Sequence, residues 1–103
     1  MTLSVNELAT KLEKELGSKV SKGNGAENKA AIQAAVDTLK KEAKGKTVGN
    51  VLDAYASSPF DFDKLASNSA IDKDSKSFLS ALEEARWASS RFLEQYDKDT
   101  VIG

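Results

Sequence analysis

The chain has 103 residues, of which 40% are hydrophobic, and 15 basic against 16 acidic side chains give a formal net charge of −1. This length fits a single domain, residues 1–103, with one modest core. The absence of Cys and His excludes a disulfide scaffold, a Cys or His zinc site, a cysteine nucleophile and histidine catalysis. No apolar run is long enough to cross a bilayer and no signal-peptide core follows Met1, so we expect a soluble protein that is cytoplasmic or secreted by a signal-independent route.

The first predicted helix covers residues 4–17. Ser4 and Glu7 have the spacing of a capping box, and Gly17 is expected to end the helix in the left-handed conformation. The apolar residues of this segment recur at helical spacing and predict one buried face: Val5, Leu8, Ala9, Leu12 and Leu16.

Residues 18–25 are rich in Gly, Ser and Asn and predict a flexible loop with a single apolar anchor, Val20. Asn24 and Glu27 repeat the capping spacing, so a second helix is expected over residues 26–44 and should end at Gly45. Its predicted buried face has the same periodicity as the first: Ile32, Ala35, Val36, Leu39 and Ala43.

A third, shorter helix is expected from Thr47 as N-cap to about Ala56, because Pro59 restricts the residue before it to extended conformations. Its predicted buried residues are Val48, Val51, Leu52 and Tyr55. An irregular stretch follows, in which we expect Phe60 and Phe62 to anchor the chain and Asp61 to cap one helical turn that runs to Leu65.

The longest helix is expected over residues 75–96, with Asp72 or Asp74 as its cap. Leu79 and Leu93 should widen its near-heptad seam, which consists of Phe78, Leu82, Ala85, Ser89, Phe92 and Tyr96. The tail from about residue 97 has no periodic pattern and is expected to fray, although Val101 and Ile102 are apolar enough to dock. No segment predicts a strand, so the expected fold is all-α, a small antiparallel bundle of four to five helices.

Two short patterns imitate ligand sites without completing them. Gly45-Lys46-Thr47 looks like the end of a phosphate-binding loop, but the required earlier Gly is Lys40 and a helix precedes the pattern. Asp72, Asp74 and Glu83 occupy ligand positions of a calcium loop that lacks its Gly and its middle oxygen ligand. We therefore expect no catalytic residues, no metal and no cofactor, and a protein that is not an enzyme.

Basic residues gather in the first half of the chain, where nine Lys oppose six acidic residues, while the second half has six basic and ten acidic residues. The densest cluster is at the predicted end of the second helix: Lys40, Lys41, Lys44 and Lys46. Favourable pairing with the helix C-terminus accounts for such a cluster. The alternative is a patch that contacts the phosphates of nucleic acid or an anionic lipid surface.

Trp87 lies about 140° around the last helix from Leu82, away from the predicted seam. Arg86 and Arg91, the two Arg of the chain, flank it, and Glu84 lies on the same side. One interpretation is that the helix is wrapped on several sides and Trp87 belongs to the core. The other is that Trp87, Arg91, Arg86 and Glu84 form an exposed patch, because Trp and Arg dominate protein interfaces.

The hypothesis that follows is a non-enzymatic helical module, of the adaptor, inhibitor or effector type, that docks one helix face on a partner protein. One alternative is a nucleic-acid-binding protein that uses the basic cluster at residues 40–46. Another is self-assembly, in which the seam from Phe78 to Tyr96 pairs with a second copy. The sequence leaves the oligomeric state open.

Overall fold

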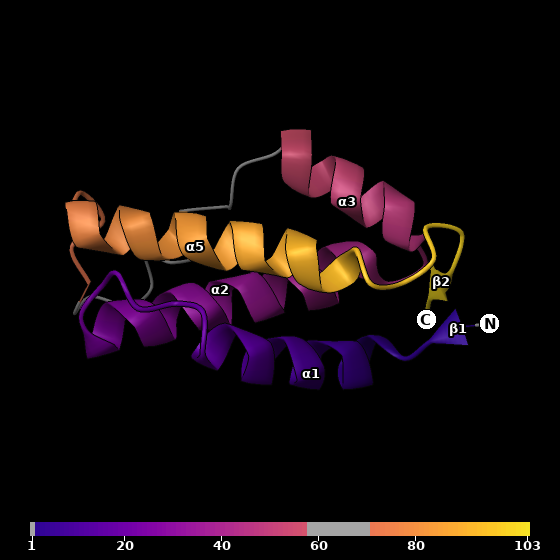
Figure 1. Ribbon diagram of the computed structural model, residues 1–103, viewed down its shortest axis with the longest axis horizontal. Helices are drawn as coiled ribbons and strands as arrows, with labels where there is room; N and C mark the ends of the chain where they lie inside the picture. The colour runs from indigo at the N-terminus through magenta and orange to yellow at the C-terminus, as the bar shows by residue number, and fades with distance from the viewer. Residues whose placement is uncertain (1, 58–70) are drawn as a thin grey trace.

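The computed structural model describes residues 2–57 and 71–103, and these residues are mostly helical (Figure 1). The helices are α1 (Val5–Gly17), α2 (Gly25–Ala43), α3 (Val48–Ser57) and α5 (Lys76–Leu93), and two short strands are β1 (Thr2–Leu3) and β2 (Val101–Ile102). The all-α class is confirmed in this broad sense. The expectations for Phe60, Phe62 and the turn from Asp61 to Leu65 lie outside the described residues. Within the described ranges no helix has the length and apolarity to span a membrane.

Three of the helices begin at the caps that the sequence predicts. The Oγ of Ser4 accepts a hydrogen bond from the amide of Glu7, at 3.3 Å. Asn24 and Glu27 form a complete capping box, each side chain accepting from the other residue's amide. The Oγ1 of Thr47 accepts from the amide of Asn50 at 3.2 Å and so caps α3.

The predicted cap of α5 is wrong. Ser75 is the N-cap, and its Oγ accepts from the amide of Phe78. The carboxylate of Asp72 accepts instead from the amide of Asp74 and forms a turn just before the helix. The carboxylate of Asp72 therefore shapes the turn that leads into α5, and the hydroxyl of Ser75 caps the helix.

The two predicted glycine stops behave differently. Gly45 has φ +83° and closes α2 as expected. Gly17 is the last residue of α1 and does not have a positive φ, so its predicted left-handed conformation is wrong. Ser18 ends α1: its amide donates to the carbonyls of Glu15 and Leu16, and its Oγ donates to the carbonyl of Glu15. These hydrogen bonds satisfy the last carbonyls of the helix without a left-handed residue.

α2 and α5 run in the same direction, and α1 runs opposite to both (Figure 1). At one end Glu27, near the start of α2, accepts hydrogen bonds from Ser75 and Ser77 at the start of α5. At the other end Gly45, after α2, donates to the carbonyl of Ile102, after α5, at 2.7 Å. α3 packs on α5 and α2. The expected antiparallel bundle of four to five helices is therefore not confirmed.

The core forms where the inner faces of these helices meet, and the predicted stripes account for most of it. All five predicted residues of α1 are buried, whereas Ile32 in α2 and Leu52 in α3 are only partly buried. In α5 the predicted widening by Leu79 is wrong, because Leu79 is 42% exposed and Ala81 is buried in its place. The seam residues from Phe78 to Ser89 are buried inside the chain, whereas Phe92 and Tyr96, at the far end of the predicted seam, are only partly buried.

The buried carboxylate of Glu27 joins the starts of α2 and α5 through hydrogen bonds. The carboxylate of Glu27 is buried and accepts hydrogen bonds from its own capping box and from the hydroxyls of Ser75 and Ser77, at 2.8 and 2.7 Å. These hydrogen bonds hold the pKa of Glu27 below its ordinary value, the Asn24 amide contributing most. On α3, burial raises the pKa of Tyr55, and the hydroxyl of Ser89 on α5 opposes that shift.

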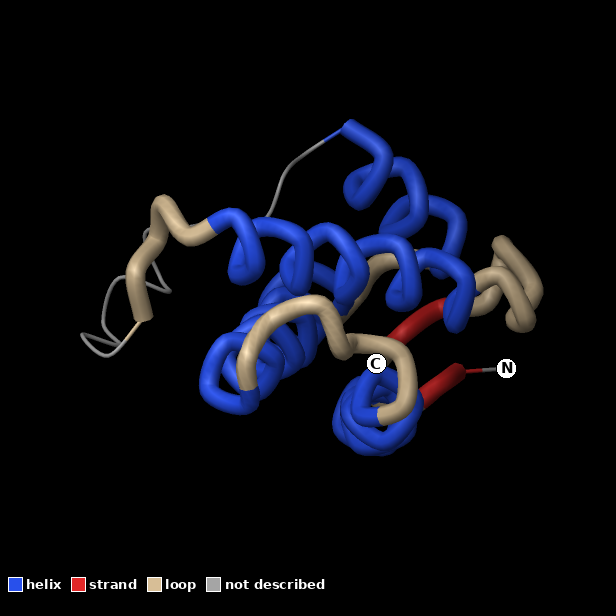
Figure 2. Tube along the Cα trace, turned by 60° about the vertical axis from the view of Figure 1, so that its left-hand side comes forward, coloured by secondary structure: helices blue, strands red, loops and turns tan. Residues whose placement is uncertain are grey.

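The C-terminal tail does not fray, and the expected absence of strands is also wrong. β2 pairs in parallel with β1 and makes an isolated bridge to Thr47 on its other side, so both termini lie together (Figure 2). Gly103 donates to the carbonyl of Leu3 at 2.7 Å and accepts from the amide of Val5 at 2.8 Å. Ile102 is completely buried. One buried side chain and a short backbone ladder therefore order a segment that has no helical periodicity.

Candidate protein-binding groove

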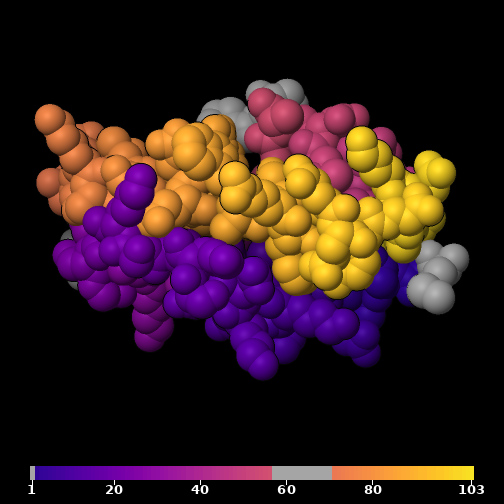
Figure 3. Space-filling view, in the orientation of Figure 1, coloured from indigo at the N-terminus to yellow at the C-terminus, as the bar shows by residue number. Residues whose placement is uncertain are grey.

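An open groove of about 940 Å³ lies between α1 and α5. The seam between the orange-to-yellow α5 and the indigo-to-purple α1 runs across the face shown in Figure 3. The groove (hereafter the α1–α5 groove) is lined by cations, aromatic rings and a few short polar side chains: Lys11, Lys14, Glu15, Ser18, Lys19, Glu84, Trp87, Ala88, Arg91, Phe92, Gln95 and Tyr96. Three of the four residues of the predicted patch, Glu84, Trp87 and Arg91, are among them.

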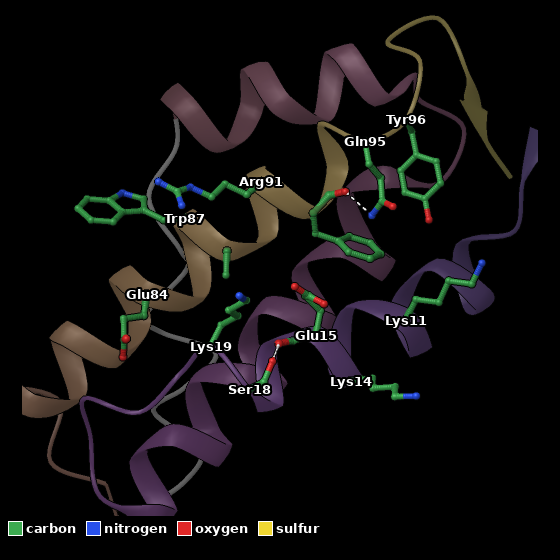
Figure 4. Close-up of a pocket in the computed structure, with 12 residues that line it drawn as sticks. Lys11, Lys14, Glu15, Ser18, Lys19, Glu84, Trp87, Arg91, Gln95 and Tyr96 are labelled. Atoms are coloured by element: carbon green, nitrogen blue, oxygen red, sulfur yellow. Dashed lines mark hydrogen bonds between the residues drawn. The ribbon is translucent and has the colours of Figure 1, made fainter.

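Trp87 lies at the surface of α5, where 57% of the residue is exposed. This decides between the two interpretations that the sequence left open, because a core Trp would be largely covered. Arg91 follows one helical turn later and is also exposed, and its guanidinium points toward the Trp87 side of the groove (Figure 4). The off-seam position of Trp87 therefore places an indole and a guanidinium side by side on one face of α5.

Glu84 shapes the groove from one end. Its Oε1 accepts hydrogen bonds from the amides of Ser21 and Lys22, at 3.0 and 2.8 Å. The side chain of Asn28 accepts from the amide of Gly23 and donates to its carbonyl. The loop between α1 and α2, which the sequence predicts to be flexible, is thus held by specific hydrogen bonds, with Val20 buried as expected. Glu84 positions this loop rather than standing free for a partner.

The floor of the groove is apolar. Phe92 and Tyr96 are partly buried and pack edge to face, with ring centroids 5.9 Å apart and planes at 71°. Ala88 lies between Trp87 and Phe92 along the sequence of α5, and its small methyl side chain leaves the groove open at this point. Ala88, Phe92 and Tyr96 therefore add apolar surface to the lining of the groove.

The rim of the groove is mainly cationic. Lys19 and Lys11 lie toward its two ends on the α1 side, while Arg91 lies on the α5 side (Figure 4). Among the described residues no carboxylate is within ion-pair distance of any of these three cations. Glu15 directs its carboxylate into the groove, whereas the ammonium of Lys14 points away from α5 (Figure 4). The groove thus presents cations that have no partner within the described chain.

The remaining predicted residues lie elsewhere. Arg86 is partly buried and does not line the groove, because it lies on another side of α5 from Trp87. The basic cluster at the end of α2, which consists of Lys40, Lys41, Lys44 and Lys46, is exposed. The ammonium of Lys46 pairs with the carboxylate of Glu42 at 3.7 Å. Over residues 2–57 and 71–103 no group of three or more acidic side chains converges as metal ligands would.

The residues that line the groove on the α1 side could not be predicted from the sequence. Lys11 and Glu15 on α1 and Lys19, just after its end, recur every four residues and form a polar stripe in the sequence that is typical of any solvated helix face. Their place opposite Trp87 depends on α1 lying beside α5, and nothing in the sequence states which helices are neighbours. Comparison with known protein families, with curated proteins and with solved structures finds no match for this chain.

Proposed function

We propose that this protein is a non-enzymatic binding module that docks the α5 face carrying Trp87 and Arg91 on a partner protein. The exposure of Trp87 carries the proposal. Trp87 is 57% exposed, so more than half of this large residue is not covered by the core, and Trp and Arg are among the residues most enriched at the energetic centres of protein interfaces.

The magnitude supports a specific contact. A Trp side chain offers up to about 250 Å² of surface, so covering the exposed part of Trp87 removes roughly 140 Å² from water. At about 25 cal/mol per Å² this is worth roughly 3 kcal/mol before the entropic costs of association. We therefore expect Trp87→Ala to weaken partner binding by between about tenfold and a hundredfold.

The experiment compares two exposed apolar residues on the same helix. Leu79 is 42% exposed on α5 but does not line the groove, so Leu79→Ala is the matched control for Trp87→Ala. Tagged wild type, Trp87→Ala and Leu79→Ala are used to capture partners from an extract of the native host, and the captured protein is then purified and titrated. We expect wild type and Leu79→Ala to bind equally and Trp87→Ala to lose the partner. Equal binding by Trp87→Ala, or no specific partner, would contradict the proposal.

The alternative function is nucleic-acid binding through the exposed Lys40–Lys46 cluster. The cluster is open to solvent, but the exposed aromatic ring of the described residues, Trp87, lies on α5 and not within it, and Glu42 lies within the cluster and pairs with Lys46. Retention of the wild-type protein on a DNA column at low salt, lost in a Lys40→Glu, Lys44→Glu variant, would favour this alternative.

A further inference from the structure

We propose that the α1–α5 groove binds an acidic segment of a partner protein that carries one large apolar anchor side chain. This inference rests on the proposed protein-binding function and adds the chemistry of the partner. Two observations carry it, one from the charges at the rim and one from the apolar floor.

The charge of the segment follows from the rim. Lys11, Lys19 and Arg91 surround the groove, and no carboxylate among the described residues pairs with any of them. Of the two carboxylates that line the groove, Glu84 already accepts two amide hydrogen bonds from the loop between α1 and α2. The rim therefore complements negative charge, in a protein whose overall charge is −1.

The anchor follows from the floor. The indole of Trp87 is exposed at the groove, and Ala88 and the packed rings of Phe92 and Tyr96 supply further apolar surface to its lining. A leucine- or phenylalanine-sized side chain packed against the indole of Trp87 would cover its exposed surface, with acidic neighbours able to reach the cations of the rim. An acidic segment without an anchor would leave this indole exposed, so both features are required.

A peptide fits these observations better than a nucleic acid strand does. Single-stranded nucleic acid binds on a series of open aromatic faces along a basic track. Here Phe92 and Tyr96 pack edge to face and are partly buried, so Trp87 is the ring in the groove that offers an open face.

The first test selects ligands without assuming their sequence. A random dodecapeptide library displayed on phage is depleted on the Trp87→Ala protein and then panned on the wild type. We expect the enriched peptides to carry net negative charge together with a Leu, Phe or Trp. Enrichment of neutral or basic peptides, of acidic peptides without an apolar residue, or of no peptide at all would overturn the inference.

The second test maps the charges. The best peptide that contains no Trp is titrated by following the emission of Trp87, which is the single Trp of the chain and so reports only on the groove. Lys19→Glu and Lys11→Glu are each expected to weaken binding by about tenfold, and Lys40→Glu, the same change outside the groove, should leave it unchanged. An equal effect of all three variants, or displacement of the peptide by single-stranded DNA of matched length, would also overturn the inference.

The natural partner separates this inference from the function on which it rests. If the captured partner depends on Trp87 but not on Lys11, Lys19 or salt concentration, the protein-binding function holds and the acidic segment is refuted. If the selected acidic peptides bind as expected while the captured partner is indifferent to Trp87→Ala, the groove chemistry holds and the proposed function is refuted.

Discussion

Ile102→Ala tests the docking of the C-terminal tail, on which the closed end of the fold depends. Ile102 is completely buried beside β1 and the residues that follow α2, and its backbone accepts from Gly45 and donates to the carbonyl of Lys46. The change removes three side-chain carbons, worth about 2.4 kcal/mol at roughly 0.8 kcal/mol each. The cavity left behind raises the expected loss of stability to about 3 kcal/mol.

The control for this variant is its neighbour. Val101 lies on the same strand with the same backbone pairing but is 43% exposed, so Val101→Ala should cost less than about 0.5 kcal/mol. Urea denaturation followed by circular dichroism gives both values, and thermal unfolding should show a fall in Tm of roughly 15 °C for Ile102→Ala alone. Equal stability of Ile102→Ala and wild type would refute the docking of the C-terminal tail and would support the frayed tail that the sequence predicts.

Three further predictions concern the elements that support the groove. Glu84→Gln should weaken the hold on the loop between α1 and α2, seen as faster hydrogen exchange at the loop amides with little change in α3. Because the folded-state pKa of Glu27 is lowered, its carboxylate stabilises the fold at neutral pH, and this contribution is lost as the pH falls below about 4. The stability of Glu27→Gln should therefore depend less on pH across that range. A pH profile identical to that of the wild type would contradict the role of this carboxylate. Gly45→Ala should cost about 1 kcal/mol in denaturation experiments because of its φ of +83°, whereas Gly17→Ala, which is free of such strain, should be neutral or stabilising.

The parts of the fold that depend on local sequence could be predicted. Caps at Ser4, Asn24 and Thr47 satisfy backbone donors within three residues, so their spacing alone identifies the helix starts. The buried stripe of α1 is also local, since periodicity assigns a face before any neighbour is known. The stop at Gly45 follows from the same kind of argument, because a left-handed residue is required there.

The parts that depend on long-range pairing could not be predicted. β1 and β2 are each two residues long and pair across almost the whole chain, so neither has a pattern of its own. The parallel course of α2 and α5 rests on Glu27 reaching Ser75 and Ser77, a contact between residues about fifty positions apart. The same limit applies to the groove: Trp87 and Arg91 stand out in the sequence, while the opposing lysines look like an ordinary solvated face.

The most direct test of the groove as the binding surface is a map of backbone amide chemical shifts. The ¹⁵N-labelled protein is titrated with the purified partner, or with the best selected peptide, and the shifted amides are located on the structure. We predict that the largest shifts lie along residues 11–19, in and just beyond α1, and along residues 84–96, in and just beyond α5. Shifts confined to residues 40–46, or to β1 and β2, would contradict the account.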